Sequence, residues 1–173
     1  MFPVLSISSV VAIYIAQNIG AQNINRAKEA FRLGMKLSVT LMFIGAVLII
    51  PFRYFFVGLF SNDPTTLKYA ASYTLFLHIG LPLMGVFQMF LSTFQGSGDT
   101  RYAFYMAIIR LWVIRIPLVL ISTTFTNLGP SGIWYSILAS NFLMIFVGMY
   151  FYKKVDFSPK TNDNNFKNKS GVI

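Results

Sequence analysis

The carboxylate side chains of this 173-residue chain all lie outside its long apolar stretches. They are Glu29, Asp63, Asp99, Asp156 and Asp163. A carboxylate buried among membrane-spanning helices is a common binding group for the cation that drives ion-coupled transport. The sequence therefore predicts that any such cation site takes its acid from somewhere other than these apolar stretches.

His78 is the only histidine, and it lies inside an apolar stretch at about residues 68–94. At about 1.5 Å per helical residue, its ring would lie ~15 Å from the end of that helix. Such a ring can bind a proton or a substrate, because imidazole changes charge near neutral pH. The alternative is a neutral ring that hydrogen-bonds a neighbouring helix.

Amide and hydroxyl side chains supply further candidate contacts for a small molecule. One small-polar stripe has i+3/i+4 helical spacing and comprises Gly85, Gln88, Ser92 and Gln95. Lipid cannot hydrogen-bond an amide, so such residues must face either a cavity or another helix. The predicted substrate-contacting residues, which offer hydrogen bonds or a π-face, are Gln17, Asn18, His78, Gln88 and Asn141.

Arg110 and Arg115 are the only charges well inside an apolar stretch, which runs from about residue 102 to 123. A lipid-facing arginine near the membrane centre costs at least ~2.5 kcal/mol. We therefore expect these side chains to face water, carbonyl groups or the membrane interface. They would repel a cationic substrate, which favours an anchoring or gating role over direct binding of cations.

Catalytic chemistry has no support in the residue pattern. The chain has no cysteine, and no His, Asp and Glu residues occur at metal-ligand spacing. No Ser–His–acid arrangement or glycine-rich phosphate loop is visible. We expect no enzyme activity, no metal centre and no cofactor.

The composition indicates an integral membrane protein. Hydrophobic residues make up 55% of the chain and charged residues 11%, whereas a soluble domain has about 25% charged residues. The net charge of +9 could suit a nucleic-acid binder, but the basic residues lie mostly at the ends of apolar runs. We therefore expect a lipid bilayer, and no nucleic acid, as the partner.

The elements that must position these side chains are five predicted membrane helices. They lie at about residues 2–17, 33–51, 68–94, 102–123 and 132–152. They make residues 1–152 a helical lobe fragment, and we expect residues 153–173 to be a polar, disordered tail.

Local signals mark the helix ends and the packing faces. Asp63 reads as an N-cap followed by a proline at the first helical position, and Asp99 or Thr100 as the cap of the fourth span. Prolines inside the third and fourth spans, Pro82 and Pro117, predict kinks or local opening. Small residues in the fifth span, Gly132, Ser136 and Ser140, predict a close-packing seam.

The loop charges predict the orientation. One side carries Arg26, Lys28, Arg32, Lys36, Arg101, Lys153 and Lys154, and the other carries Arg53 and Lys68. By the positive-inside rule the first side is cytoplasmic, and so is the tail. Residue 1 is then outside, from which we expect a further span upstream.

Three junctions resemble the multidrug and toxic compound extrusion (MATE) transporters. They are Ile15-Ala-Gln-Asn-Ile-Gly-Ala-Gln-Asn-Ile-Asn-Arg-Ala-Lys28; Gly80-Leu-Pro-Leu-Met-Gly85 with Phe94-Gln-Gly-Ser-Gly-Asp-Thr-Arg101; and Gly129-Pro-Ser-Gly-Ile-Trp-Tyr-Ser136. The resemblance implies a two-lobe, all-α membrane fold with six helices in each lobe. The polar tail suits the C-terminal lobe, so the five helices would be most of that lobe.

The resemblance also implies a function: export of cationic lipophilic small molecules from the cell in exchange for Na⁺ or H⁺, across the plasma membrane. Some branches of the family are expected to use acids in the seventh and tenth spans. The stretch at 68–94 would be the tenth span and has no acid, so the coupling acid would lie in the missing part, which includes the N-terminal lobe. Two alternatives are a flippase for lipid-linked oligosaccharides, whose pyrophosphate would suit Arg110 and Arg115, and a non-transporting membrane remnant or interaction protein.

Overall fold

The computed structural model describes residues 2–125 and 129–158, and the regular elements of that part are all helices. They form five continuous helical spans that are long and apolar enough to cross a membrane, which confirms the predicted all-α membrane fold. The elements are α1 (Phe2–Gly20), α2 (Ile24–Ile49), α3 (Arg53–Gly58), α4 (Pro64–Gly96), α5 (Thr100–Ile108), the π-helix η1 (Ile109–Arg115), α6 (Ile116–Thr124) and α7 (Pro130–Tyr152). Helices α5, η1 and α6 are continuous and together form one span.

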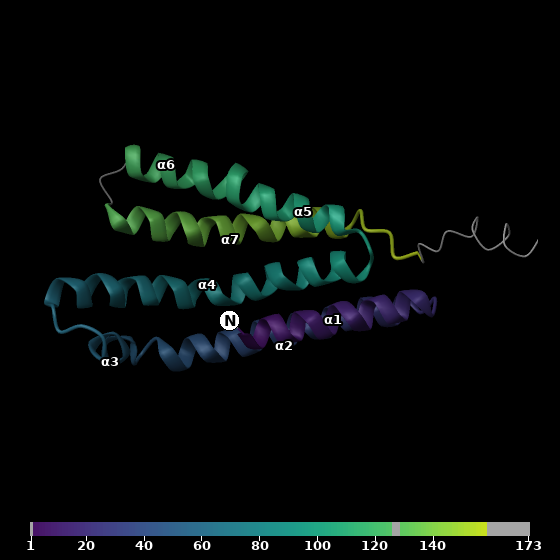
Figure 1. The fold of residues 1–173 in the computed structure, drawn as a ribbon, viewed down its shortest axis with the longest axis horizontal. Coiled ribbons are helices and arrows are strands. Elements are labelled where there is room, and N and C mark those ends of the chain that lie inside the picture. Colours follow the sequence, from purple (N-terminus) through teal and green to yellow (C-terminus); the bar gives the residue numbers. More distant parts are fainter. Residues whose placement is uncertain (1, 126–128, 159–173) are drawn as a thin grey trace, which may run out of the picture.

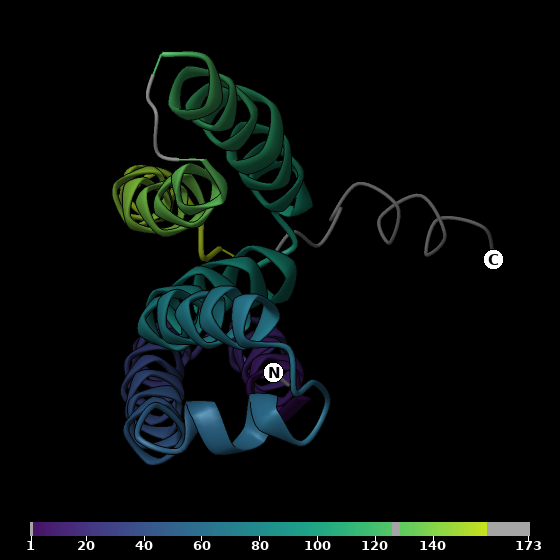
Figure 2. The same ribbon diagram turned by 90° about the vertical axis from the view of Figure 1, so that its left-hand side faces the viewer.

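Helix α4 lies at the centre of the bundle (Figures 1 and 2). Helices α1 and α2 pack together on one side of it, and α7 packs on the other side. The continuous α5–η1–α6 span lies against α7, on the side away from α1 and α2 (Figure 2). The second half of α4 therefore has neighbours on both sides, and most of the buried residues of α4 lie there.

Close packing of this core depends on small residues at the helix crossings. A Cβ on Gly96 would lie only 2.5 Å from the carbonyl oxygen of Ala12, and one on Gly148 would overlap the ring of Phe90. Small residues let membrane helices approach closely, which compensates for the absence of a hydrophobic driving force between them. The large side chains that fill the remaining space include Ile15, Phe87, Met89, Phe94, Met106 and Met144.

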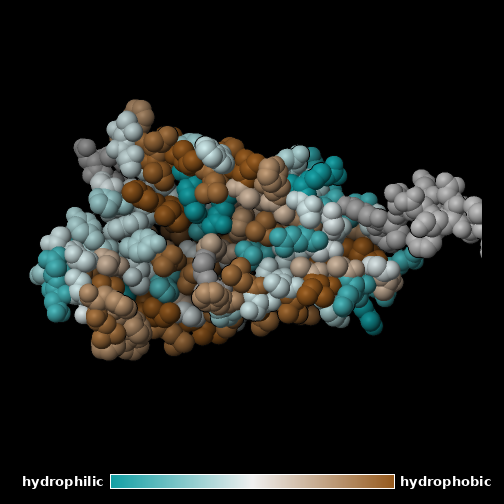
Figure 3. Space-filling model, viewed as in Figure 1, coloured by the Kyte–Doolittle hydropathy of each residue, from teal (hydrophilic) through white to brown (hydrophobic). Residues whose placement is uncertain are grey.

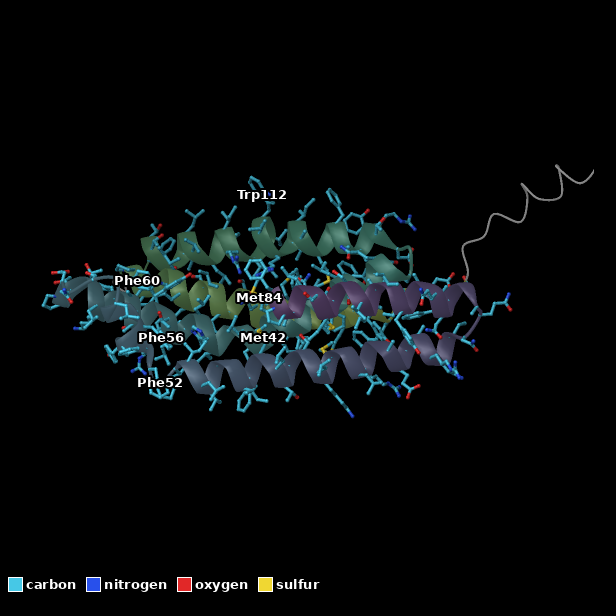
Figure 4. The ribbon with its side chains drawn as sticks, turned by 60° about the horizontal axis from the view of Figure 1, so that its bottom comes forward. Met42, Phe52, Phe56, Phe60, Met84 and Trp112 are labelled. Atoms are coloured by element: carbon cyan, nitrogen blue, oxygen red, sulfur yellow. The ribbon has the colours of Figure 1, made fainter. Side chains whose placement is uncertain are left out.

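The outer surface of the bundle is mainly apolar. Trp112 is 68% exposed and points away from the other helices (Figure 4). Hydrophobic residues cover much of the face seen in Figure 3. A water-soluble monomer rarely exposes so large an apolar surface, whereas a lipid-facing one requires it.

The two ends of the bundle differ in their basic charge. The α1–α2 turn, the α4–α5 turn and the end of α7 lie at one end, and α3 lies at the other (Figure 1). The first end carries Arg26, Lys28, Arg32, Arg101, Lys153 and Lys154, with Lys36 further along α2. The other end carries Arg53 and Lys68 together with the aromatic residues Phe52, Phe56 and Phe60 (Figure 4).

The two predicted acidic caps have different outcomes. The Asp63 carboxylate accepts a hydrogen bond of 2.7 Å from the backbone N–H of Thr66, at the start of α4. This bond lowers the pKa of the Asp63 carboxyl, so the cap persists into mildly acidic solution. Asp99 occupies the cap position of α5 but makes no cap bond. Its carboxylate instead accepts a bond of 3.3 Å from the backbone N–H of Asp156.

The chain returns to the bundle after α7. Val155 and Phe157 are buried against the core, although the sequence places both in the polar tail. The Phe157 ring packs edge-on against Tyr152, and the Lys28 ammonium lies 5.7 Å from its centre. The segment after α7 therefore covers the basic end of the bundle. The rest of the predicted tail lies outside the described residues.

Candidate functional site

A cavity of about 190 Å³ lies among α4, η1 and α7. A single water needs only about 10–15 Å³ of such space, so the cavity is large enough for a small organic molecule. Aromatic and aliphatic side chains form most of its wall, and three polar side chains come from η1 and α7. The lining residues are Tyr73, Phe76, Leu77, Gly80, Leu81, Met84, Arg110, Arg115, Trp134, Ile137, Leu138 and Asn141.

The π-helix places both arginines on the same face. In an α-helix, residues five apart point about 140° away from each other. In η1 the backbone bonds run from residue i to i+5, as the bond from Ile116 N–H to the Leu111 carbonyl shows, and this brings such residues together. Pro117 gives the physical reason, because its ring excludes the carbonyl of residue 113 from an α-helical position and it has no N–H to donate.

Asn141 joins the two arginines. Its side-chain oxygen accepts hydrogen bonds from Nη2 of Arg110 at 3.3 Å and from Nη2 of Arg115 at 3.2 Å. Arg115 also donates from Nε to the hydroxyl of Ser140 at 3.3 Å. Asn141 is only 5% exposed, so this oxygen is a fixed acceptor held between two cationic groups.

Arg110 has a second, non-polar contact. Its guanidinium carbon lies 4.3 Å from the centre of the Phe87 ring on α4, in cation–π geometry. Its Nε is buried without a hydrogen-bond partner among the described residues. The arginine is therefore held by α7 and α4 but retains unused hydrogen-bonding capacity.

The partners of both guanidinium groups in this structure are electrically neutral. The acids of the described part lie elsewhere: Glu29 is exposed in the first turns of α2, and Asp63, Asp99 and Asp156 lie outside the helices that span the bundle. Two positive charges thus share a partly buried cavity without a carboxylate at hand, and the cavity is electropositive.

A second, smaller cavity of about 60 Å³ lies among α1, α2 and α4. The side chain of Gln88 is the one amide among its described lining residues, and Met42 of α2 and Met84 of α4 also line it. None of its described lining residues is charged. Leu81 and Met84 line both cavities, so α4 forms a shared wall between them.

The structure thus separates the five predicted contact residues. Asn141 lines the arginine cavity and Gln88 the smaller one. Gln17 is exposed, and Asn18 donates 2.8 Å to the Tyr14 carbonyl within α1. His78 is half-buried, with Nδ1 2.7 Å from the carbonyl oxygen of Thr74 on its own helix. These three line neither cavity.

The small residues of the predicted seam in α7 pack against the α6 side. The Ser136 hydroxyl bonds the Ser122 hydroxyl and donates to the Leu118 carbonyl, both at 3.0 Å. A Cβ on Gly132 would meet the Ser122 side chain at 3.2 Å. This seam fixes α7 against α6 and so holds Asn141 opposite η1.

Sequence reasoning did not predict the shared arginine–asparagine site. It placed Arg110 and Arg115 on an ordinary helix and treated Asn141 separately. The available signal was Pro117 two residues after Arg115, since a proline disturbs the bonding of the preceding turn. Within the described residues no three His, Cys, Asp or Glu side chains come together, so that part of the chain offers no candidate metal centre.

Comparison with known proteins agrees with this architecture. The MatE family model matches residues 1–121. The "Probable multidrug resistance protein YoeA" of Bacillus subtilis is 26% identical over 132 residues, which cover 76% of this chain and 28% of that protein. Two proteins named "Probable multidrug resistance protein NorM" match similarly. The one from Streptococcus pneumoniae is 29% identical over 80% of this chain and 30% of its own length. The one from Listeria monocytogenes serovar 1/2a is 26% identical over 84% of this chain and 32% of its own length.

The chain therefore spans about three tenths of the length of these curated relatives. Because the family model covers well over half of the sequence, the chain belongs to the MatE family.

Proposed function

We propose that this chain is part of a multidrug efflux transporter that exports lipophilic cations in exchange for Na⁺ or H⁺. Its membership of the MatE family carries the proposal, and the printed names of its relatives support it. The chain would supply five helices of the C-terminal lobe. The N-terminal lobe would come from the same or a separate polypeptide.

The cavity around Gln88 is the part of this chain best suited to varied lipophilic cations. Its lining is uncharged, and two methionines contribute flexible, polarisable side chains that adapt to ligands of different shape. Gln88 can orient a ligand through its amide. The cavity around Gln88 is too small for a drug-sized molecule, so we propose that it forms one wall of a larger cavity that the other lobe completes.

The driving ion would bind outside this chain. Glu29, exposed in the first turns of α2, is the one acidic residue of the described part that lies in a candidate span, and a buried acid is the usual binding group for a coupling cation. In the complete transporter the two lobes would rock against each other, and ion binding in one conformation would release the substrate. In the plasma membrane, the basic end of the bundle would lie on the cytoplasmic side.

Efflux from proteoliposomes tests this function. Liposomes containing the complete transporter are loaded with a fluorescent lipophilic cation, and its release is followed with a Na⁺ gradient, an H⁺ gradient or neither. We expect one gradient to accelerate release, and we expect no such acceleration with the 173-residue chain alone. A release rate that neither gradient changes would contradict the proposal, and so would gradient-driven release by this chain alone.

A variant of Gln88 tests the proposed wall. Gln88→Leu removes the amide while keeping a similar volume, and we expect the cation concentration for half-maximal efflux to rise about five- to tenfold, the effect of losing one hydrogen bond. Gln95→Leu is the matched control, because Gln95 is exposed on the same helix. Equal effects of the two changes would exclude Gln88 from the binding wall.

A further inference from the structure

The cavity among α4, η1 and α7 has an unbalanced charge. Two guanidinium groups donate to one neutral oxygen, that of Asn141. Like charges in a low-dielectric site repel each other, and a buried charge without a counter-ion is costly. An anion placed beside the two groups would relieve both penalties.

The hydrogen-bonding capacity of the two arginines also favours a bound anion. Each guanidinium carries five N–H donors in a planar fork. The structure gives Arg110 one hydrogen-bond acceptor and Arg115 two. Both side chains line the cavity, and Arg110 Nε is buried with no hydrogen-bond partner in the part of the chain that the structure describes. A carboxylate or phosphate matches this fork geometry, because its oxygens can each accept from a guanidinium.

The rest of the wall indicates what should accompany the anionic group. Tyr73, Phe76 and Trp134 form an aromatic side to the cavity, and the ring of Trp134 contacts the other two rings. Most of the remaining lining residues are aliphatic. A molecule with a charged head and a compact apolar body would satisfy both parts of this wall.

We propose that this cavity binds the carboxylate or phosphate group of a small amphiphilic anion. Arg110 and Arg115 hold the oxyanion, and Asn141 fixes the two guanidinium groups. The apolar body of the ligand lies against the aromatic residues of α4 and α7. The site is distinct from the proposed cation-contacting wall at Gln88, although α4 borders both.

Binding of three matched probes tests the charge preference. Benzoate, benzamide and benzylammonium have nearly the same shape and carry a negative, a neutral and a positive group. The chain has two tryptophans. In a Trp112→Phe background only Trp134, which lines the cavity, reports by fluorescence. With the chain in nanodiscs of neutral lipid, we expect benzoate to change Trp134 emission at concentrations at least about tenfold lower than benzamide. We expect no saturable response to benzylammonium.

Substitutions then locate the binding group. Arg110→Gln and Arg115→Gln should each raise the dissociation constant of benzoate about tenfold or more, the effect of losing a charged hydrogen bond. Arg101→Gln is the matched control, because Arg101 is exposed at the start of α5. Asn141→Asp places a fixed carboxylate within reach of both guanidinium groups, so it should abolish benzoate binding while raising the melting temperature. That variant keeps the test valid if the arginine variants do not fold.

Two further arms identify the source of the anionic group. Phenyl phosphate in place of benzoate compares phosphate with carboxylate. Nanodiscs containing phosphatidic acid show whether a lipid headgroup competes with benzoate: competition assigns the site to a lipid phosphate, and its absence assigns it to a free solute. Equal binding of benzoate and benzylammonium, or benzoate binding that survives Arg110→Gln, Arg115→Gln and Asn141→Asp, would overturn the proposal. These assays measure binding and not transport, so their outcome does not depend on the outcome of the efflux experiment.

Discussion

At the scale of single residues, the polar groups of the spans fall into satisfied and unsatisfied sets. Hydroxyls such as Ser92 and Thr93 donate to carbonyls of their own helix. The hydroxyl of Ser38 is buried on α2 and has no hydrogen-bond partner among the described residues. An unsatisfied buried hydroxyl is destabilising, because it has lost its water without gaining a replacement.

Ser38 and Ser92 form a matched pair for testing this difference, since both are fully buried. We expect Ser38→Ala to leave the free energy of unfolding unchanged or to raise it by up to about 1 kcal/mol, and Ser92→Ala to lower it by about 0.5–1.5 kcal/mol. Unfolding in mixed detergent–SDS micelles measures both. A larger loss for Ser38 than for Ser92 would mean that Ser38 has a bonding partner.

At the scale of elements, the decisive feature is the π-helix before Pro117. An α-helix would turn the two arginines away from each other. The i+5 bonding of η1 instead places both of them on one face, which is directed at α7. The functional surface of this span therefore depends on a local change in helix type.

Replacing Pro117 tests that dependence. Pro117→Ala restores an N–H that can bond the carbonyl four residues earlier, so the segment should return toward α-helical bonding. We expect benzoate affinity to fall at least fivefold without a loss of thermal stability, as the arginines separate. Pro82→Ala is the control, because Pro82 lies in α4 and lines a different cavity. Unchanged benzoate binding in Pro117→Ala would show that η1 does not need the proline.

The α1–α4 crossing gives a second prediction at this scale. Gly96→Ala would place a methyl group 2.5 Å from the Ala12 backbone oxygen, so the helices must move apart. We expect the free energy of unfolding to fall by about 1–3 kcal/mol. A Cβ on Gly45 of α2 would meet nothing within 4 Å, so Gly45→Ala should be neutral or stabilising by up to about 1 kcal/mol. Similar destabilisation by both changes would point to helix propensity in place of packing.

At the scale of the whole molecule, the bundle has two chemically different ends. Most of the basic residues near the helix ends lie at one end of the bundle, and α3 with its aromatic residues lies at the other (Figures 1 and 4). Positive charge favours the cytoplasmic side, whereas aromatic rings suit either interface. The distribution predicts which end a reagent outside the cell can reach.

Cysteine labelling measures this orientation directly, because the chain has no cysteine of its own. We expect Asn62→Cys, in the exposed loop before α4, to react with a membrane-impermeant maleimide on intact cells. Arg101→Cys, exposed at the other end, should react only after the cells are opened. The reverse pattern would invert the proposed orientation.

The sequence by itself determined the number and type of the spans and the charge difference between their ends. These properties are local, because a membrane helix needs only about 20 apolar residues in succession and satisfies its backbone within itself. It also predicted the Asp63 cap and the small-residue seam of α7, which depend on a few neighbouring positions.

Only the tertiary structure decided which polar side chains share a cavity. The meeting of Arg110, Arg115 and Asn141 requires the π-helical register of η1 and the packing of α7 against it. The capture of the Asp99 carboxylate by the segment after α7 likewise joins residues 57 positions apart. A residue pattern sets the faces of each helix, but the rotation and contacts of one helix against another follow from packing, which no single segment contains.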